Sequence, residues 1–487
     1  MSANSRYSHI PPVDLGFASR REFLTAAAGG LGSIALSCLL HEESAHASTP
    51  SEEIGPVRPH YAPRAKRVIQ IFCCGGISHI DTFDYKPELA RLHGMEMSNK
   101  GKVDTFFNQP GRLMKTPFAF KQHGQSDRWV SSLLPNLAGC VDDMTFIHSM
   151  RAKSANHTPA TFQMNSGFTM NGFPCLGSWL SYGLGTENQD LPAFVVLPDP
   201  RGLPAGGAIN WTSGFLPATT QGVPFNTRGN PVDDLNPPND VSRSKRQASL
   251  ALLDGMNRDF LHNNPGDSAI AARIKSYELA ARMQASIPQV IDLSHEPEHI
   301  QKMYGLDNPA TQGFARNCLM ARRLLEKGVR FVQMYHGGAF GSPRINWDAH
   351  EDIVENHTRQ AANMDQPVAA LLKDLKARGM LEDTLVLHTT EFGRLPITQG
   401  IGSTGRDHHP HGFTIWMAGA GLKPGMALGS TDEIGYFAAE KPQEVYDLHA
   451  TVLHLLGLDH KKLTYYYNGI QRRITDVHGN VIREVLA

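Results

Sequence analysis

Short apolar runs rich in β-branched residues recur along the chain, and helical patterns separate several of them. The first run, residues 67–74, ends at a Gly-Gly pair, which is typical of a buried strand and its exit turn. Comparable runs cover residues 144–147, 194–197, 329–334, 385–388 and 413–417. Apolar residues at i, i+3 and i+4 spacing predict helices over 247–260, 269–285, 314–327 and 361–377. This alternation predicts an α/β fold with a mostly parallel central sheet and helices on both faces.

The last two predicted helices carry signals for where they end. Gly328 and Gly379 follow them at the position where a left-handed residue commonly closes a helix. Pro367 lies inside the last pattern, and there it either kinks the helix or marks its true start.

One long stretch, residues 198–240, interrupts the alternation of strands and helices. Its 43 residues contain 8 Pro and 6 Gly and show no sustained periodicity. Structureless loops longer than about 12–15 residues are usually functional or disordered. The stretch is therefore interpreted either as a surface insertion or as a loop that walls a substrate cleft.

The beginning of the chain resembles an export signal rather than part of a fold. Residues 19–24 form a twin-arginine pattern, an uncharged Gly/Ala-rich run follows, and Ala45-His46-Ala47 matches a cleavage site. The run is too short to span a bilayer, which takes about 20 strongly apolar residues. The sequence thus predicts a signal peptide at 1–47, a linker at 48–65 and a single domain at 66–487. It predicts a periplasmic or secreted protein that the twin-arginine translocase carries in the folded state.

Charge and cysteine content exclude two classes of protein. The chain has 46 Lys+Arg against 47 Asp+Glu, a net charge of −1, so it has no positive field with which to bind nucleic acid by bulk charge. Five cysteines remain after the predicted cleavage site, and no C-x-x-C motif is present, so a disulfide scaffold is not expected. No segment predicts a stable membrane span.

Carboxylates and histidines follow several of the predicted strands. Ligands of open α/β sheets bind at the carboxyl ends of the strands, so these side chains are expected to meet there. A mixed set of carboxylates and imidazoles without thiolates suits one or two divalent ions, namely Zn, Mn, Mg or Ca. Each such residue taken alone is more often structural, and their shared location carries the argument. Side chains of this kind near the predicted strand ends include Asp81, Asp348, His350, Glu391, His408 and His411.

Several motifs together resemble a known family over about residues 67–460. They are the Gly-Ile-Ser-His-Ile-Asp-Thr-Phe-Asp segment at 76–84, Trp-Asp-Ala-His at 347–350, Thr-Glu-Phe-Gly-Arg at 390–394, Arg-Asp-His at 406–408, and residues 447–453. The chain is similar to the secreted domain-of-unknown-function family fifteen-oh-one, a remote relative of the alkaline phosphatase, sulfatase and nucleotide pyrophosphatase superfamily. The resemblance implies an alkaline-phosphatase-like fold.

The resemblance also implies roles for individual residues. Asp81 matches the metal-binding carboxylate after the first strand, Asp348 and His350 match one metal site, and Glu391 replaces an aspartate. His408 or His411 matches the late histidine ligand. Ser154 is the favoured nucleophile and Thr158 the reserve, because both lie in the segment where the superfamily carries its nucleophile. Phe392 stands where the superfamily has a metal-binding histidine, so one site is weak, rebuilt from His409, or missing.

Three functions from different classes follow. The first is a metal-dependent hydrolase of phosphate or sulfate esters with an anionic substrate, glycan esters included. In that hydrolase Arg394 either clamps a substrate oxygen through its planar guanidinium or forms a structural ion pair. The second is a non-catalytic member that binds a glycan or an envelope protein. The third is an exported redox enzyme. This function is disfavoured because no dinucleotide-binding G-x-G-x-x-G motif follows a predicted strand.

Overall fold

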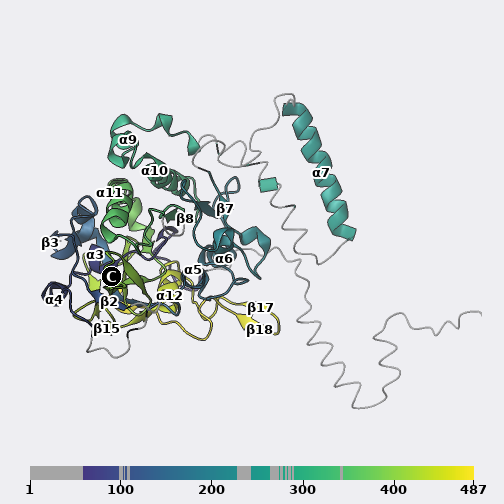
Figure 1. Ribbon diagram of the computed structural model, residues 1–487. Coiled ribbons are helices and arrows are strands. Elements are labelled where there is room, and N and C mark those ends of the chain that lie inside the picture. The colour runs from purple at the N-terminus through teal and green to yellow at the C-terminus, as the bar shows by residue number, and fades with distance from the viewer. Residues whose placement is uncertain are drawn as a thin grey trace, which may run out of the picture. The chain divides into compact units, whose positions relative to one another are not determined.

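The protein is described from a computed structural model, in which the described residues lie between 59 and 487 and belong to one compact unit (Figure 1). The predicted signal peptide at 1–47 and most of the predicted linker lie outside the described residues, as does most of the predicted helix at 269–285. Within the described part of the chain, no helix has the length and apolarity needed to cross a membrane. The described residues are 59–97, 103, 105–106, 110–226, 243–263, 274, 278–279, 282, 287, 290–339 and 344–487.

A nine-stranded sheet forms the centre of the unit, and all six predicted strands belong to it. Its strand order is β13-β5-β12-β9-β1-β8-β6-β7, with β16 beside β5. Only β12 runs antiparallel to its neighbours, β5 and β9. The predicted α/β fold with a mostly parallel sheet is therefore confirmed. The strands are β1 Arg67–Cys73, β5 Met144–Arg151, β6 Phe194–Leu197, β7 Val223–Pro224, β8 Phe331–His336, β9 Thr384–Thr389, β12 Phe413–Ala418, β13 Ala427–Leu428 and β16 Gln443–Glu444.

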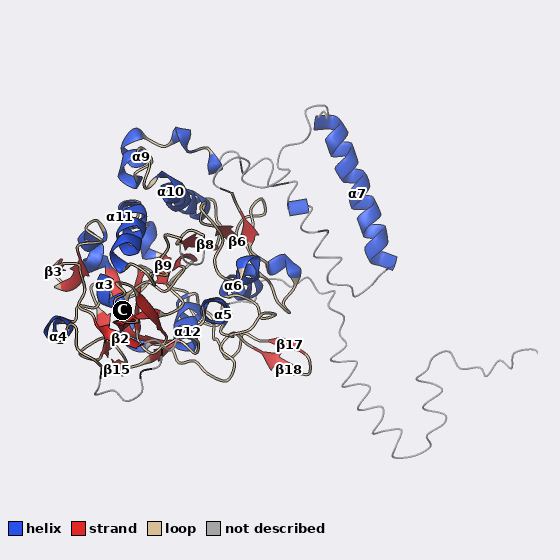
Figure 2. Cartoon of the chain, in the orientation of Figure 1, coloured by secondary structure: helices blue, strands red, loops and turns tan. Residues whose placement is uncertain are grey.

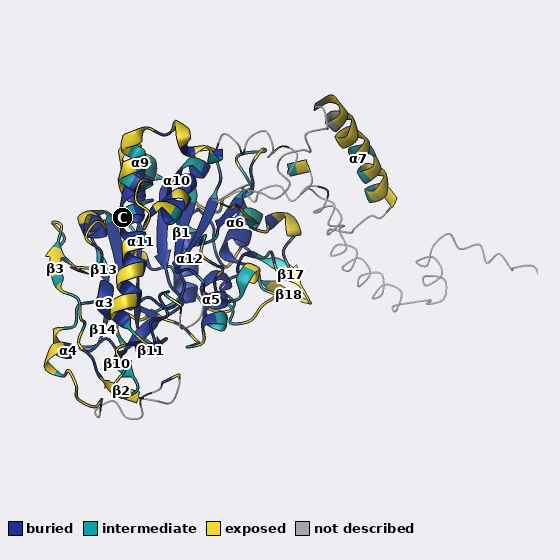
Figure 3. Ribbon diagram, turned by 45° about the horizontal axis from the view of Figure 1, so that its top comes forward, coloured by how far each residue is buried: buried dark blue, intermediate teal, exposed yellow. Residues whose placement is uncertain are grey.

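Both faces of the sheet are covered, which explains why its strands are apolar throughout rather than alternating. Ile69 and Ile71 of β1 belong to a core shared with α10 (Gln312–Glu326) and α11 (Ile353–Ala377). Val68 and Phe72 belong to a second core shared with α6 (Leu176–Leu184) and α12 (Val445–Leu455). Figure 2 shows the strands between these two helical layers, and Figure 3 shows the sheet as the buried centre.

The helix ends follow the predicted signals, but one start does not. Gly328 and Gly379 have φ of +86° and +68° and follow the last residues of α10 and α11, as predicted. Helix α11 begins at Ile353, eight residues before the predicted start, and runs through Pro367. It begins there because the Asp352 carboxylate accepts hydrogen bonds from two backbone N–H groups of the first turn. Helix α7 (Arg243–Asn263) contains the predicted helix at 247–260.

The described part of the long stretch, residues 198–226, belongs to the fold. Strand β7 pairs with β6 at the edge of the sheet. Trp211 ends a 3₁₀ turn over Gly207–Trp211 and packs into the second core. The remaining residues, 227–240, lie outside the described part of the chain.

A small sheet of three strands carries part of the candidate site. In it, β10 (Gly393–Gln399) lies between β11 (Arg406–His409) and β2 (Pro110–Leu113). The antiparallel register places Arg394 opposite His408. The other short elements are α3 His79–Thr82, α4 Pro87–Arg91, β3 Phe120–His123, β4 Arg128–Ser131, α5 His157–Ser166, α9 Glu298–Tyr304, β14 Ser430–Thr431, β15 Ala438–Glu440, β17 Tyr465–Tyr467 and β18 Ile470–Arg472.

Candidate metal centre

Three imidazoles and one carboxylate converge beside the carboxyl ends of the central strands. His157 is the first residue of α5, Asp348 and His350 lie in the segment that leads to α11, and His408 lies in β11. One ligand atom from each residue lies within 4.8 Å of all the others, and all four residues are buried. Three segments far apart in the sequence therefore build one compact group, called here the His/Asp group.

The distances between side-chain atoms in the His/Asp group are close to those between ligand atoms that bind one metal ion. His408 Nε2 lies 2.8 Å from His157 Nε2 and 2.9 Å from His350 Nε2. Asp348 Oδ1 lies 2.7–3.2 Å from the same three nitrogens. Around a tetrahedral zinc ion with ordinary bond lengths, neighbouring ligand atoms are about 3.3 Å apart. The group thus has nearly the dimensions of a tetrahedral metal site.

The hydrogen bonds of the three Nδ1 atoms determine that each imidazole presents the lone pair of its Nε2 atom to the group. Each Nδ1 faces an oxygen that can only accept a hydrogen bond, so Nδ1 carries the proton and Nε2 presents its lone pair to the group. This arrangement is the one that orients histidine ligands in metal sites. The acceptors are Glu391 Oε1 for His157 (2.6 Å), the Ala155 carbonyl for His408 (2.7 Å) and Gln399 Oε1 for His350.

A metal ion fits the chemistry of this donor set. Three lone pairs and a carboxylate oxygen that face one another at about 3 Å repel unless a proton or a cation lies between them. Imidazole and carboxylate ligands without thiolates are typical of divalent metal sites. The His/Asp group can therefore hold a divalent metal.

Three of the predicted metal ligands lie in the His/Asp group, and one member was missed. Asp348, His350 and His408 are brought together as predicted. His157 is not among the predicted ligands, although it lies between the predicted nucleophiles Ser154 and Thr158, in the segment that leads from the carboxyl end of β5 into α5. That position, together with Asn156, which caps α5, was the signal that could have identified it.

Glu391 does not belong to the His/Asp group. It contacts the Nδ1 atom of His157, on the side of the ring that faces away from the group. Its Oε1 accepts hydrogen bonds from His157 Nδ1 at 2.6 Å and from the backbone N–H of Gly75 at 2.8 Å. Its Oε2 accepts from the Thr390 hydroxyl at 3.2 Å. In this structure Glu391 orients a ligand rather than acting as one.

Asp81 also lies outside the His/Asp group. Both of its carboxylate oxygens face the Arg406 guanidinium, at 2.7 and 3.3 Å, and Ser78 donates a further hydrogen bond at 2.6 Å. Burial disfavours its charge, but Arg406 outweighs burial and lowers the pKa of Asp81. The structure does not bring Asp81 into the His/Asp group, and both of its carboxylate oxygens are held by Arg406 and Ser78 instead.

Arg394 forms a structural ion pair, the second of its two predicted roles. It is fully buried, and its guanidinium lies 2.5 Å from Asp348 Oδ1. Its remaining N–H groups donate to the backbone carbonyls of Gly75, Gly76 and Arg406. A clamp on a substrate oxygen needs donors directed at the substrate, so the structure does not support that role.

The residues weighed as a second metal site do not join the group. The His409 ring faces the Tyr436 carbonyl, and His411 packs 5.5 Å from His409 between ring centroids. Phe392 is fully buried, with its ring 4.7 Å from that of His157 and 4.8 Å from that of His408. An apolar ring thus fills the space beside the His/Asp group.

Ser154 and Thr158, the two predicted nucleophiles, lie on either side of His157 in the chain. The Ser154 hydroxyl is half-buried and accepts a hydrogen bond from the Asn156 N–H at 3.0 Å. Its neighbour Ala155 is the residue whose carbonyl holds His408. Thr158 directly follows His157 on the first turn of α5. Both hydroxyls are thus carried by the segment that supplies part of the group.

Metal binding is expected to weaken by about tenfold per pH unit below the pKa of His157, because each bound ion then displaces one proton. Burial alone would lower this pKa, but hydrogen bonds to Asp348 and Glu391 outweigh burial and raise it. Affinity is therefore constant above the raised pKa and falls below it. Isothermal titration of the metal-free protein with Zn²⁺ at several pH values measures the breakpoint.

The matched variant for this titration is Glu391→Gln. It is expected to weaken binding about 10–100-fold at neutral pH, as loss of an orienting partner does. It is also expected to move the breakpoint to lower pH, because the carboxylate that raises the pKa of His157 is gone. An unchanged breakpoint would contradict the assigned role of Glu391.

Fold and site together define an α/β protein with a buried group of histidines and a carboxylate that could hold a metal. The chain belongs to the family described as protein of unknown function (DUF1501), whose model matches residues 65–486. No curated protein matches it.

Solved structures that are similar to the chain include sulfatases and members of the alkaline phosphatase superfamily. One is the PsFucS1 sulfatase from Pseudoalteromonas sp., 12% identical with a TM-score of 0.34 over 83% of this chain and 70% of that one. The phosphonate monoester hydrolase SpPMH from Silicibacter pomeroyi is 14% identical, with a TM-score of 0.33 over 72% and 71%. A variant of TAB5 alkaline phosphatase with bound magnesium is 10% identical, with a TM-score of 0.33 over 82% and 99%.

Proposed function

We propose that this chain is a metal-dependent hydrolase of phosphate or sulfate esters. The observation that carries the proposal is the convergence of three oriented imidazoles and one carboxylate at 2.7–3.2 Å. A divalent ion held there would stabilise the negative charge that develops on the oxygens of a transferring ester group. The family resemblance supplies the ester class.

We infer that the ion is zinc. Three nitrogen ligands and one oxygen ligand suit zinc, whereas calcium and magnesium prefer sites built from oxygen atoms alone. We also infer one metal per chain, because Phe392 fills the space beside His157 and His408 where a second ion would need ligands.

In this proposal Ser154 supplies the nucleophile. Its hydroxyl is half-buried and is positioned by the Asn156 N–H. The two contacts that tie its segment to the metal centre both follow it in the chain, through the Ala155 carbonyl and through His157. The twin-arginine leader in the sequence supports export, so we place the substrate outside the cytoplasm, with the translocase as a transient partner.

A second function is favoured by one specific observation. The His/Asp group offers four protein ligands, as closed structural metal sites do, whereas catalytic zinc sites usually keep one position open. A non-catalytic scaffold that binds a glycan or an envelope protein would retain such a closed site. Turnover, not metal content, separates the two functions.

The test combines metal analysis with an ester screen. Protein exported and purified without chelators or a His-tag is expected to contain about one zinc per chain, and to hydrolyse 4-nitrophenyl phosphate or sulfate. Ser154→Ala is expected to lower turnover by at least about 10³-fold and to keep its zinc, while the neighbouring Thr158→Ala serves as control. Bound zinc without turnover of any ester would instead establish the scaffold. A protein that takes up no metal would contradict both functions.

A further inference from the structure

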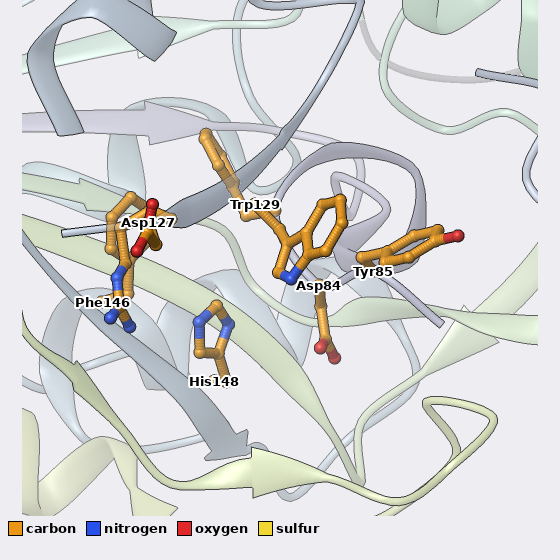
Figure 4. Close-up of a pocket in the computed structure, with 8 residues that line it drawn as sticks. Asp84, Tyr85, Asp127, Trp129, Phe146 and His148 are labelled. Atoms are coloured by element: carbon orange, nitrogen blue, oxygen red, sulfur yellow. The ribbon is translucent and has the colours of Figure 1, made fainter. Parts of the chain in front are cut away.

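A second candidate site lies away from the His/Asp group and shares no residue with it. It is a pocket of about 110 Å³ between the segment after α3, strand β5 and the β3–β4 hairpin. Figure 4 shows Trp129, Asp84 and His148 around the same space. Pockets for whole cofactors are larger, about 300–1,000 Å³, so this one suits a single small unit.

Four of the eight residues that line the pocket are Phe, Tyr or Trp. Phe83 and Phe146 close the inner side, with their centroids 5.5 Å apart. Tyr85 packs 4.5 Å from Trp129 and 5.2 Å from Phe120. Trp129 is 38% exposed, so its indole is reachable from solvent at the rim. The pocket thus offers flat apolar faces that stand partly open.

The charged groups around the pocket balance. Asp84 and Asp127 contribute two negative charges, Arg128 lines the pocket with one positive charge, and Lys86 lies 2.9 Å from Asp84. Burial raises the pKa of Asp84, but Lys86 outweighs burial and lowers it, so the carboxylate stays ionised. A strongly charged ligand of either sign would therefore meet a like charge.

The same wall offers both donors and acceptors of hydrogen bonds. His148 contacts the Thr414 hydroxyl through Nδ1 at 3.0 Å, and burial lowers its pKa to about 4, so the imidazole is neutral. A neutral imidazole has one donor and one acceptor nitrogen, while Arg128 only donates and Asp84 only accepts. A ligand with several hydroxyl groups can satisfy such a mixed set.

We propose that this pocket binds one neutral sugar ring. A pyranose has an apolar C–H face that packs on Trp129 and Tyr85, and hydroxyl groups that pair with Asp84, Arg128 and His148. A cation cage would also use aromatic walls, but here Lys86 and Arg128 already supply the positive charges. The proposal goes beyond the ester chemistry and would hold for a catalytic or a non-catalytic protein.

The test is saturation-transfer NMR of the full chain with methyl glycosides of glucose, galactose, mannose and N-acetylglucosamine. At least one glycoside is expected to bind with a millimolar Kd, as small ligands of shallow sites do. Trp129→Ala is expected to weaken this binding at least tenfold. The matched control is Tyr466→Ala, which removes another exposed ring, 63% exposed on β17, and is expected to change nothing.

Two further variants keep the outcome interpretable. Asp127→Asn removes a carboxylate but tolerates the positive φ of 52° at that position, and is expected to weaken binding several-fold. His350→Ala removes a metal ligand and is expected to bind the glycoside as well as the unaltered protein, which separates this proposal from the hydrolase. Binding of no glycoside, binding that survives Trp129→Ala, or binding of tetramethylammonium instead would each overturn the proposal.

Discussion

Replacement of Asp348 by alanine is expected to abolish metal binding and to destabilise the metal-free fold by about 3–5 kcal/mol. Asp348 Oδ1 belongs to the His/Asp group and also pairs with Arg394 at 2.5 Å. Because Arg394 is fully buried, loss of the carboxylate leaves an uncompensated charge inside the protein. Elemental analysis and urea unfolding of the chelated protein measure the two effects.

The control for Asp348→Ala is a variant that loses the metal but leaves the buried Arg394 paired with Asp348. His350→Ala removes one ligand and the contact with Gln399, and is expected to lose zinc while costing only about 1–2 kcal/mol. If Asp348→Ala kept its zinc, the metal centre would be wrongly assigned. If it were no less stable than His350→Ala, the structural role of the Arg394 pair would be wrong.

Replacement of Asp81 by alanine is expected to cost a similar amount, about 3–5 kcal/mol, and yet to leave the zinc in place. Asp81 and Arg406 are both fully buried and pair at 2.7 Å. The pair fastens the segment after β1 to strand β11, and neither carboxylate oxygen faces the His/Asp group. Urea unfolding and elemental analysis of the same preparation measure stability and metal content.

A surface ion pair provides the comparison for Asp81→Ala. Asp143→Ala removes a carboxylate that faces the exposed ammonium of Lys376, and such pairs contribute about 0–1 kcal/mol. A folded Asp81→Ala protein without zinc would restore the role that the family resemblance implied for this residue. The isosteric Asp81→Asn gives a second preparation if the alanine variant does not fold.

The ion pairs Arg394–Asp348 and Arg406–Asp81 connect the small three-stranded sheet to the His/Asp group and to the segment after β1. Its register puts Arg394 opposite His408, so one strand supplies a ligand and the next supplies the cation that neutralises Asp348. Arg406, two residues before His408, then anchors the same sheet to Asp81. The small sheet therefore sets the position of His408 relative to the central strands.

By itself, the sequence determined the layers of the fold and most members of the His/Asp group. Apolar runs and helical spacing reflect burial, which is a local property, and so all six strands and the ends of α10 and α11 could be predicted. Three of the four members of the His/Asp group were also predicted, because ligands collect at the carboxyl ends of strands.

Only the tertiary structure decided which charged residues lie in the His/Asp group and which pair with its members or elsewhere. Asp81, Glu391 and Arg394 follow strand ends just as Asp348 does, but their partners lie more than 45 residues away in the chain. His157 likewise joins the His/Asp group because α5 begins where its imidazole faces His408. The physical reason is that a buried charge takes its role from its neighbour, and packing of distant segments sets that neighbour.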